Sequence, residues 1–251
     1  MDESEHTMMT AVERERRFFD QYVRDAGEFN PFSASGWNRL RRAFEELVQP
    51  GQGGDYLDLG CGTGQSRQVY SRSFSTYTGV DLSPASIAVA QQQHVGDRFL
   101  VADACQLPFA ENQFDVVAFS SVLHHIEEFS IALKEAQRVV KPGGKVFSFD
   151  PHAHHPAFAL FRNPRSPLYL SQGVSSNERP LTAAELCTAY RQAGLIDVRQ
   201  RCQSGISYRH VAPRVLNALL GMYNLADWTW QMLGLGNRFG SFVLTCGVKP
   251  M

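Results

Sequence analysis

A glycine-rich turn separates a short apolar segment from an amphipathic one in the run Leu57-Asp58-Leu59-Gly60-Cys61-Gly62-Thr63-Gly64. Glycine permits the positive φ angles of a sharp turn and the close approach of a backbone to a ligand, so this run predicts a nucleoside-cofactor site. A dinucleotide fingerprint has the spacing G-x-G-x-x-G, whereas this run has G-x-G-x-G with Gln65 at the place of the last dinucleotide glycine. The carboxylate of Asp58 opposes a pyrophosphate but suits a ligand with an ammonium and a sulfonium group, as in S-adenosylmethionine (SAM).

The same run resembles the first motif of class I SAM-dependent methyltransferases, and further motifs similar to those of this family follow in the family's order. They are Gly79-Val80-Asp81-Leu82-Ser83, Val101-Ala102-Asp103-Ala104 with Leu107-Pro108-Phe109, Phe114-Asp115-Val116-Val117 with Ser120 to His125, and Val140-Lys141-Pro142-Gly143-Gly144. The resemblance covers roughly residues 55 to 150. It implies an α/β fold with a seven-stranded, mostly parallel Rossmann-like sheet and helices on both faces.

The resemblance also implies which residues bind SAM. Asp81 would accept hydrogen bonds from both ribose hydroxyls, because a carboxylate can accept from two adjacent donors. Asp103 would accept from the adenine amino group, and Asp58 would contact the cofactor. The other expected contacts are Gly60, Cys61, Gly62, Gly64, Leu82, Ala104, Ser120 and, from an N-terminal helix, Tyr22. Structural alternatives stay open: Asp81 and Asp103 as turn or cap residues, Asp58 as a structural hydrogen-bond partner, and Cys61 as a small packing residue rather than a nucleophile.

Histidines gather where the catalytic chemistry is expected. Methyl transfer from a sulfonium is an in-line displacement to which alignment contributes up to about 7–11 kcal/mol. A positioned base adds about 10²–10⁴-fold if the acceptor must lose a proton, and histidine titrates near neutrality. His125 and His124, after the fourth expected strand, are therefore candidate bases, and Asp150, after the fifth, is a candidate substrate contact. Packing or hydrogen bonding is the alternative role for each of them.

A metal site is not expected, although His152, His154 and His155 also follow the fifth expected strand. Adjacent histidines point in different directions on any regular element, and no fixed ligand spacing recurs along the chain.

The elements that position these residues follow from periodicity. Short apolar segments predict strands at 56–59, 77–81, 98–102, 114–119, 145–150 and 242–248. Amphipathic segments predict helices from about Gln65, from Pro84, over 128–140, and after Thr182, which forms a capping box with Glu185. This alternation predicts a parallel sheet with its ligand beyond the carboxyl ends of the strands.

Two inserts and an N-terminal helical cap complete the expected organisation. Residues 1–50 form the cap, and residues 51–251 form the methyltransferase domain with substrate-cap inserts at 151–181 and 205–238. The insert segment 211–235 is mostly apolar, with a narrow stripe of polar residues at Arg214, Asn217, Asn224, Asp227 and Gln231. It is interpreted as a buried helix, a lid over a hydrophobic substrate, or a dimer or membrane-surface contact; the absence of lysine weakens the membrane version. In the first insert, Arg162 or Arg165 either holds an anionic group or is solvated.

Length, charge and cysteine content indicate the number of domains, the kind of partner and the location of the protein. The 251 residues suit one large domain, and 24 Lys and Arg against 25 Asp and Glu give no pull toward nucleic acid. The run Arg14-Glu15-Arg16-Arg17 is interpreted as a solvated helix face. Five scattered cysteines, the polar segment Met1 to Thr10 and the lack of 18 uninterrupted apolar residues predict a cytoplasmic protein with reduced thiols and no membrane span.

The function predicted from the chain is a SAM-dependent methyltransferase acting on oxygen, nitrogen or carbon of a small or amphiphilic molecule, such as a saccharide, a lipid-like compound or a secondary metabolite. A homodimer is left open. Nucleic-acid base methylation is disfavoured, because Ser120 to Leu123 replace the Asn-Pro-Pro-Tyr type of motif. The alternatives are a SAM-binding regulatory or partner subunit that transfers no methyl group, and an NAD-dependent oxidoreductase, which the glycine spacing disfavours.

Overall fold

A seven-stranded sheet forms the centre of the computed structural model, which describes residues 9–28, 30–70, 74–169, 174, 175, 177–209, 218 and 220–251. Its strand order is β3-β2-β1-β4-β5-β7-β6. The bounds are β1 Gly54–Leu59, β2 Phe74–Asp81, β3 Arg98–Val101, β4 Phe114–Ser120, β5 Val140–Pro151, β6 Ile196–Gln203 and β7 Phe242–Val248. Strands β1 to β5 run parallel, and β7 is antiparallel to both β5 and β6. The predicted seven-stranded, mostly parallel Rossmann-like sheet is confirmed.

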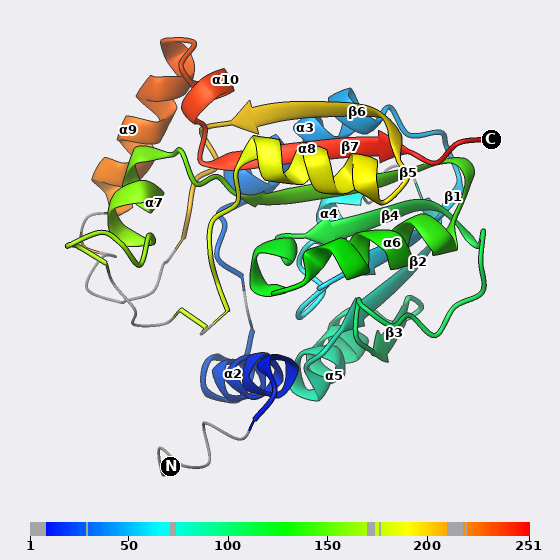
Figure 1. Ribbon diagram of the computed structural model, residues 1–251. Coiled ribbons are helices and arrows are strands. Elements are labelled where there is room, and N and C mark those ends of the chain that lie inside the picture. Colours follow the sequence, from blue (N-terminus) through cyan, green and yellow to red (C-terminus); the bar gives the residue numbers. More distant parts are fainter. Residues whose placement is uncertain are drawn as a thin grey trace.

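Helices cover both faces of this sheet, as the alternation of apolar and amphipathic segments predicts. Helices α6 (Phe129–Val139) and α8 (Ala183–Gln192) lie in front of the sheet in Figure 1, and α3 (Ala34–Val48) lies behind it. Each face therefore has its own apolar core, which is the arrangement that buries a parallel sheet on both sides. The short elements α4 (Arg67–Tyr70), α5 (Pro84–Gln93) and η1 (Leu123–His125) follow strands β1, β2 and β4.

Local sequence signals account for several element ends. Thr182 and Glu185 form the predicted capping box of α8, in which each side chain accepts the other residue's backbone N–H at 3.1 and 2.8 Å. Helix α6 covers nearly all of the predicted 128–140 segment. The motif Val140-Lys141-Pro142-Gly143-Gly144 lies within β5, so this strand begins before the predicted residue 145. Gly143 has φ +75°, and the register of β5 with β4 shifts between Phe114 and Val116.

Some of the N-terminal 50 residues line the cavity described below, and others pack on the sheet. Helix α2 (Ala11–Ala26) lies near α5 (Figure 1), and Asp20 accepts hydrogen bonds from Ser83 Oγ at 2.6 Å and from the backbone N–H of Ala85 at 3.1 Å. Helix α3 packs on the sheet instead, because the ring of Phe44 contacts those of Tyr70 and Phe147 at 5.0 and 5.1 Å. A cap over 1–50 stays a prediction, and α2, the segment Pro31-Phe32 and Trp37 of α3 are its parts at the cavity.

The inserts supply three further helices, α7 (Pro156–Phe161), α9 (Leu220–Met232) and α10 (Gly236–Phe239), gathered at one end of the molecule (Figure 1). Of the segment predicted over 211–235, residues 211–217 and 219 lie outside the described residues, as do Met1 to Met8. Among the helices of the described residues, none has the length and apolar character needed to cross a membrane.

Candidate functional site

A cavity of about 640 Å³ lies beyond the carboxyl ends of the central strands. One part of its wall comes from the motifs that follow β1, β2, β3 and β4, and the other comes from α2, α7, α9 and the segments around them. The residues that line this first part include Gly60, Cys61, Gly62, Asp81, Leu82, Asp103, Ala104, Ser120, His124 and His125. Most of the predicted cofactor residues are thereby brought together, and Tyr22 joins them from α2.

The glycine turn has the geometry that its sequence predicts. Gly60 has φ +70°, and a Cβ atom there would lie 2.5 Å from Cβ of Val122, so no side chain fits. Gly62 has φ +53° with open space on its Cβ side, and its N–H donates to Oδ2 of Asp81 at 2.9 Å. Gly64 does not line the cavity, and a Cβ there would lie 2.5 Å from the ring of His94. Its predicted contact with the cofactor therefore finds no support, and its role is close packing.

Asp81 is placed to receive a polar ligand. Its two carboxylate oxygens each accept one backbone N–H, from Gly62 and from Ser83, both at 2.9 Å. Burial raises the pKa of Asp81, although these two hydrogen bonds act in the opposite direction. A carboxylate has about four acceptor sites, so two remain for donors in the cavity. This matches the two adjacent hydroxyls of a ribose.

Asp58 faces the protein instead of the cavity. Its side chain is 1% exposed and accepts hydrogen bonds from Ser66 at 2.5 Å, Tyr77 at 2.6 Å and Ser120. Burial raises the pKa of Asp58 to about 6. Ser120 lines the cavity and is also bonded to Tyr70 at 2.7 Å. The structure therefore favours the structural alternative for Asp58, which positions Ser120 and fixes the end of β1.

His124 and Asp150 form a buried pair at the floor of the cavity. Nδ1 of His124 lies 3.0 Å from Oδ1 of Asp150, and the backbone N–H of His124 donates to the same oxygen at 3.2 Å. Burial holds the pKa of His124 well below its usual value and raises the pKa of Asp150 to about 7. His124 lines the cavity, whereas Asp150 does not. Asp150 therefore orients His124, and the substrate contact predicted for Asp150 finds no support.

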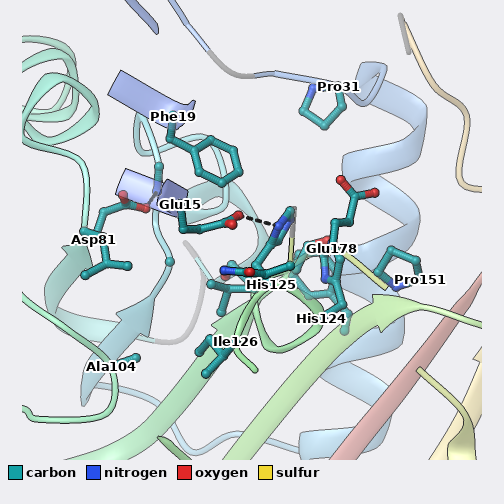
Figure 2. Close-up of a pocket in the computed structure, with 18 of the residues that line it drawn as sticks. Glu15, Phe19, Pro31, Asp81, Ala104, His124, His125, Ile126, Pro151 and Glu178 are labelled. Carbon is teal, nitrogen blue, oxygen red and sulfur yellow. Dashed lines mark hydrogen bonds and ion pairs between the residues drawn. The ribbon is translucent and has the colours of Figure 1, made fainter. Parts of the chain in front are cut away.

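His125 has a different environment, because helix α2 supplies it with a carboxylate. Nδ1 of His125 lies 2.7 Å from Oε1 of Glu15 (Figure 2). The same nitrogen lies 3.1 Å from Oγ of Ser175. Burial by itself lowers the pKa of His125, but the hydrogen bond to Glu15 and the negative charge of Glu178 more than reverse this and raise it. The ring of Phe19 packs edge-on against His125 at 5.3 Å. The pair of His125 and Glu15 thus holds α2 against the site.

The second part of the cavity wall is aromatic. Its rings come from segments far apart in the sequence: Phe32, Trp37, Phe149, Phe158, Phe161, Tyr208, Tyr223 and Phe242. Phe32 contacts the rings of Trp37, Tyr208 and Phe242 at 4.9–5.4 Å, so this wall is one packed cluster. Arg162 and Glu178 add polar groups at the same end. Arg162, offered from sequence as an anion contact, is therefore at the cavity, whereas Arg165 is exposed outside it.

Sequence reasoning missed Glu15 and the aromatic wall. The charged run around Glu15 is interpreted above as solvated, and Arg16 and Arg17 are indeed exposed, but Glu15 is only 5% exposed. A signal was present, because Glu15 precedes Phe18, Phe19 and Tyr22 at the helical spacings of three, four and seven residues. Over the part of the chain that the structure describes, no three His, Cys, Asp or Glu side chains gather in a way that could hold a metal ion.

Comparison with known proteins assigns the segment that carries the motifs. Residues 57–148 match the family model described as a methyltransferase domain. This segment is therefore similar to methyltransferase domains. The resemblance predicted from the motifs is thereby confirmed, and the domain's family disfavours the oxidoreductase alternative.

Individual relatives agree with this assignment. A demethylmenaquinone methyltransferase of Renibacterium salmoninarum is 36% identical over 124 residues, which cover 49% of this chain and 52% of that protein. O-methyltransferase cnsE of Penicillium expansum is 33% identical over 172 residues, covering 64% of this chain and 59% of that protein. The chain thus spans about half the length of the curated relatives it matches first.

The similarity in fold to solved structures extends well beyond residues 57–148. The structure of a SAM-dependent methyltransferase from Thermotoga maritima, described as a possible histamine N-methyltransferase, superposes with a TM-score of 0.61 at 18% identity, and covers 96% of this chain and 100% of that one. At this identity the similarity establishes the fold, and it includes the N-terminal helices and the inserts that lie outside residues 57–148.

Proposed function

We propose that this chain binds SAM at the glycine turn and transfers its methyl group to oxygen, nitrogen or carbon of a small apolar molecule held against the aromatic wall. The observation that carries the proposal is the single cavity, which joins Gly62 and Asp81 at one end to Phe32 and Tyr208 at the other, with His124 between them in its lining. A methyl donor and a methyl acceptor can therefore meet without crossing solvent.

The residues of the first part of the wall fit SAM. Asp81 would hold the two ribose hydroxyls through its remaining acceptor sites, and Asp103, which keeps Oδ2 beyond the bond of its Oδ1 to the N–H of Cys105 at 2.8 Å, would hold the adenine amino group. The open side of Gly62 leaves space for the backbone to approach the ligand. When bound, SAM supplies an activated methyl group. Helix α2 contributes Glu15, Phe18, Phe19 and Tyr22 to the wall of the cavity and would shield the bound cofactor on that side.

His124 is the base we assign to this site. With Asp150 ionised, Nδ1–H of His124 donates to Oδ1 of Asp150, and Nε2 keeps its lone pair for the proton of the acceptor. His125 is less suited to this role, because its Nδ1 is paired with the carboxylate of Glu15 at 2.7 Å. The two candidates left open by the sequence thus receive separate roles: His124 takes up the proton, and His125 positions α2.

The acceptor class follows from the aromatic wall and from the relatives. Flat apolar rings pack well against Phe, Tyr and Trp side chains. One relative is named for demethylmenaquinone and another for O-methylation, which supports an apolar ring that carries oxygen. A cytoplasmic location and a homodimer stay predictions from sequence.

Product formation tests this function. Wild-type protein is incubated with SAM and a panel of phenols, hydroquinones and aliphatic alcohols, and both S-adenosylhomocysteine and the methylated product are measured by mass spectrometry. We expect turnover on ring hydroxyl compounds and a loss of about 10²–10⁴-fold in kcat for His124→Gln. The matched control is His154→Gln, because His154 is exposed and does not line the cavity. Binding of SAM without any methylated product would instead favour the non-catalytic alternative.

A further inference from the structure

Three polar side chains of helix α9 bond to the protein, while four of its large apolar side chains are exposed. Asn224 exchanges two hydrogen bonds with the backbone of Tyr208, at 3.0 and 3.1 Å. Asp227 is 3% exposed and accepts from the backbone N–H of Gly205 at 2.5 Å, and Gln231 accepts from Gln203 at 3.4 Å. The polar stripe noted in the sequence is therefore used for docking, which is the reverse of an ordinary surface helix.

The outward side of α9 is correspondingly apolar. Met222, Leu225, Trp228 and Met232 are 71, 63, 49 and 66% exposed, and their spacings of three, three and four residues form one stripe. Eight of the fourteen large apolar side chains that are exposed in the described chain lie on α7, α9 and the turns after them. These eight are Leu160, Leu168, Met222, Leu225, Trp228, Met232, Leu233 and Leu235. We call them the outer apolar patch. An exposed patch of this kind marks an interaction site.

The charges around the patch indicate an anionic partner. In Pro156–Tyr169 and Leu220–Gly240, both described in full, the charged residues are Arg162, Arg165, Arg238 and the buried Asp227. Arg165 and Arg238 are exposed, so the exposed charges of these two segments are positive. Cationic side chains flanking an apolar stripe with a tryptophan fit the interface of an anionic bilayer.

The outer face of α9 is by itself small for a stable protein interface. A helix of 13 residues is about 20 Å long and about 10 Å wide, so its outer face covers roughly 200 Å². A specific protein–protein interface buries about 800 Å² on each partner. A lipid surface needs no such complementary area, because each apolar side chain inserts separately.

The two helices of the patch also line the cavity. Leu220 and Tyr223 of α9 and Phe158 and Phe161 of α7 line the aromatic part of the cavity, while other residues of the same two helices form the patch. His155, just before α7, joins the helices through its ring contact with Tyr223 at 5.7 Å. We infer that the outer apolar patch docks the protein on the surface of an anionic lipid bilayer, beside the apolar end of the cavity.

Vesicle binding tests this inference and does not require methyl transfer. The full chain is sedimented with phosphatidylcholine vesicles and with vesicles that also contain phosphatidylglycerol, and tryptophan emission is recorded. We expect binding to the anionic vesicles, a blue shift that is smaller in Trp228→Phe, and a loss of affinity of at least tenfold in Leu225→Glu and in Met232→Glu. Val95→Glu is the matched control, because Val95 is 91% exposed and lies outside the patch.

Three results would overturn the inference. One is the absence of sedimentation with anionic vesicles under conditions in which the protein binds SAM. Another is equal loss of binding in Val95→Glu and Leu225→Glu. The third is a concentration-dependent doubling of mass that Leu225→Glu abolishes, which would assign the patch to a second copy of the chain. Circular dichroism verifies that each variant is folded, and the wild-type vesicle result stands without any variant.

Discussion

The buried ion pair between Glu15 and His125 ties helix α2 to the site, so Glu15→Gln should loosen this helix. The two side chains are 7% and 11% exposed, and the N–O distance is 2.7 Å. Two further hydrogen bonds, from Ser83 and Ala85 to Asp20, also hold α2. A hydrogen bond from Asn177 to the backbone oxygen of Ala11, at 3.1 Å, is a further attachment. The variant therefore removes the ion pair and leaves these hydrogen bonds and the apolar contacts of the helix in place.

The magnitude follows from the environment of the pair. Removing one partner of a buried pair costs about 3–5 kcal/mol when the other charge stays behind. His125 can lose its proton in response, at a cost of about 1.4 kcal/mol per unit by which its pKa exceeds the pH. We therefore expect a loss at or below the lower end of that range, about 2–3 kcal/mol, which corresponds to an increase of about 30- to 150-fold in the opening equilibrium of α2.

The pH dependence has a defined sign. The pKa of His125 is raised in the folded protein. Its contribution is therefore fully present below the unfolded value of about 6.5 and is lost as the pH rises through the higher folded value. Wild-type α2 should become easier to open over that range, and Glu15→Gln should show a smaller change.

Hydrogen exchange of residues 11–26, corrected for the intrinsic rate at each pH, measures this opening. Asp25→Asn is the matched control, because Asp25 is exposed on the same helix and bonded only locally, to Gln21 at 2.8 Å. Equal exchange of α2 in Glu15→Gln and in wild type would refute the idea that this pair closes the cavity.

Two further predictions concern the other buried acids. For Asp150→Asn, kcat should fall about 10²-fold and the rise of wild-type activity through about pH 7 should disappear. The reason is that ionised Asp150 accepts from Nδ1–H of His124 and so keeps the lone pair of Nε2 available for a proton. A rise that persists in the variant speaks against this pairing. For Asp58, burial raises the pKa from 3.8 to about 6, so wild type should lose stability as the pH rises from 4 to 6. Relative to Asp58→Asn, denaturant unfolding should show this as a change of about 3 kcal/mol in the free energy of unfolding, and a pH-independent difference between the two proteins would contradict it.

The cofactor half of the site was predictable because its residues follow strand ends within short motifs. Gly62 and Asp81 approach each other since β1 and β2 are neighbouring parallel strands, and parallel strands bring their carboxyl ends to one edge. The direction of the Asp58 side chain was not predictable in the same way. It depends on hydroxyl donors from Tyr77 and Ser120 on two other strands, and motif position alone carries no information about them.

The acceptor half was not predictable, because it is built by packing between distant segments. Phe32 and Tyr208 meet through a tertiary contact across the domain, which no local periodicity records. The polar stripe of α9 was visible in the sequence, but periodicity defines a stripe and not the direction it faces. Hydrogen bonds to Gly205 and Tyr208 turn that stripe inward and leave the apolar side outside.

Calorimetric titration measures whether SAM binds between the glycine turn and Asp81. SAM, S-adenosylhomocysteine and NADH are titrated into wild type, Asp81→Asn and the control Asp115→Asn, whose carboxylate pairs with Lys141 at 2.8 Å at the other end of its strand. Losing two hydrogen bonds to a charged group, at about 1.5–3 kcal/mol each, should weaken both sulfur nucleosides by about 10²–10⁴-fold in Asp81→Asn only. Binding of NADH, or equal binding of SAM to all three proteins, would contradict the proposed site.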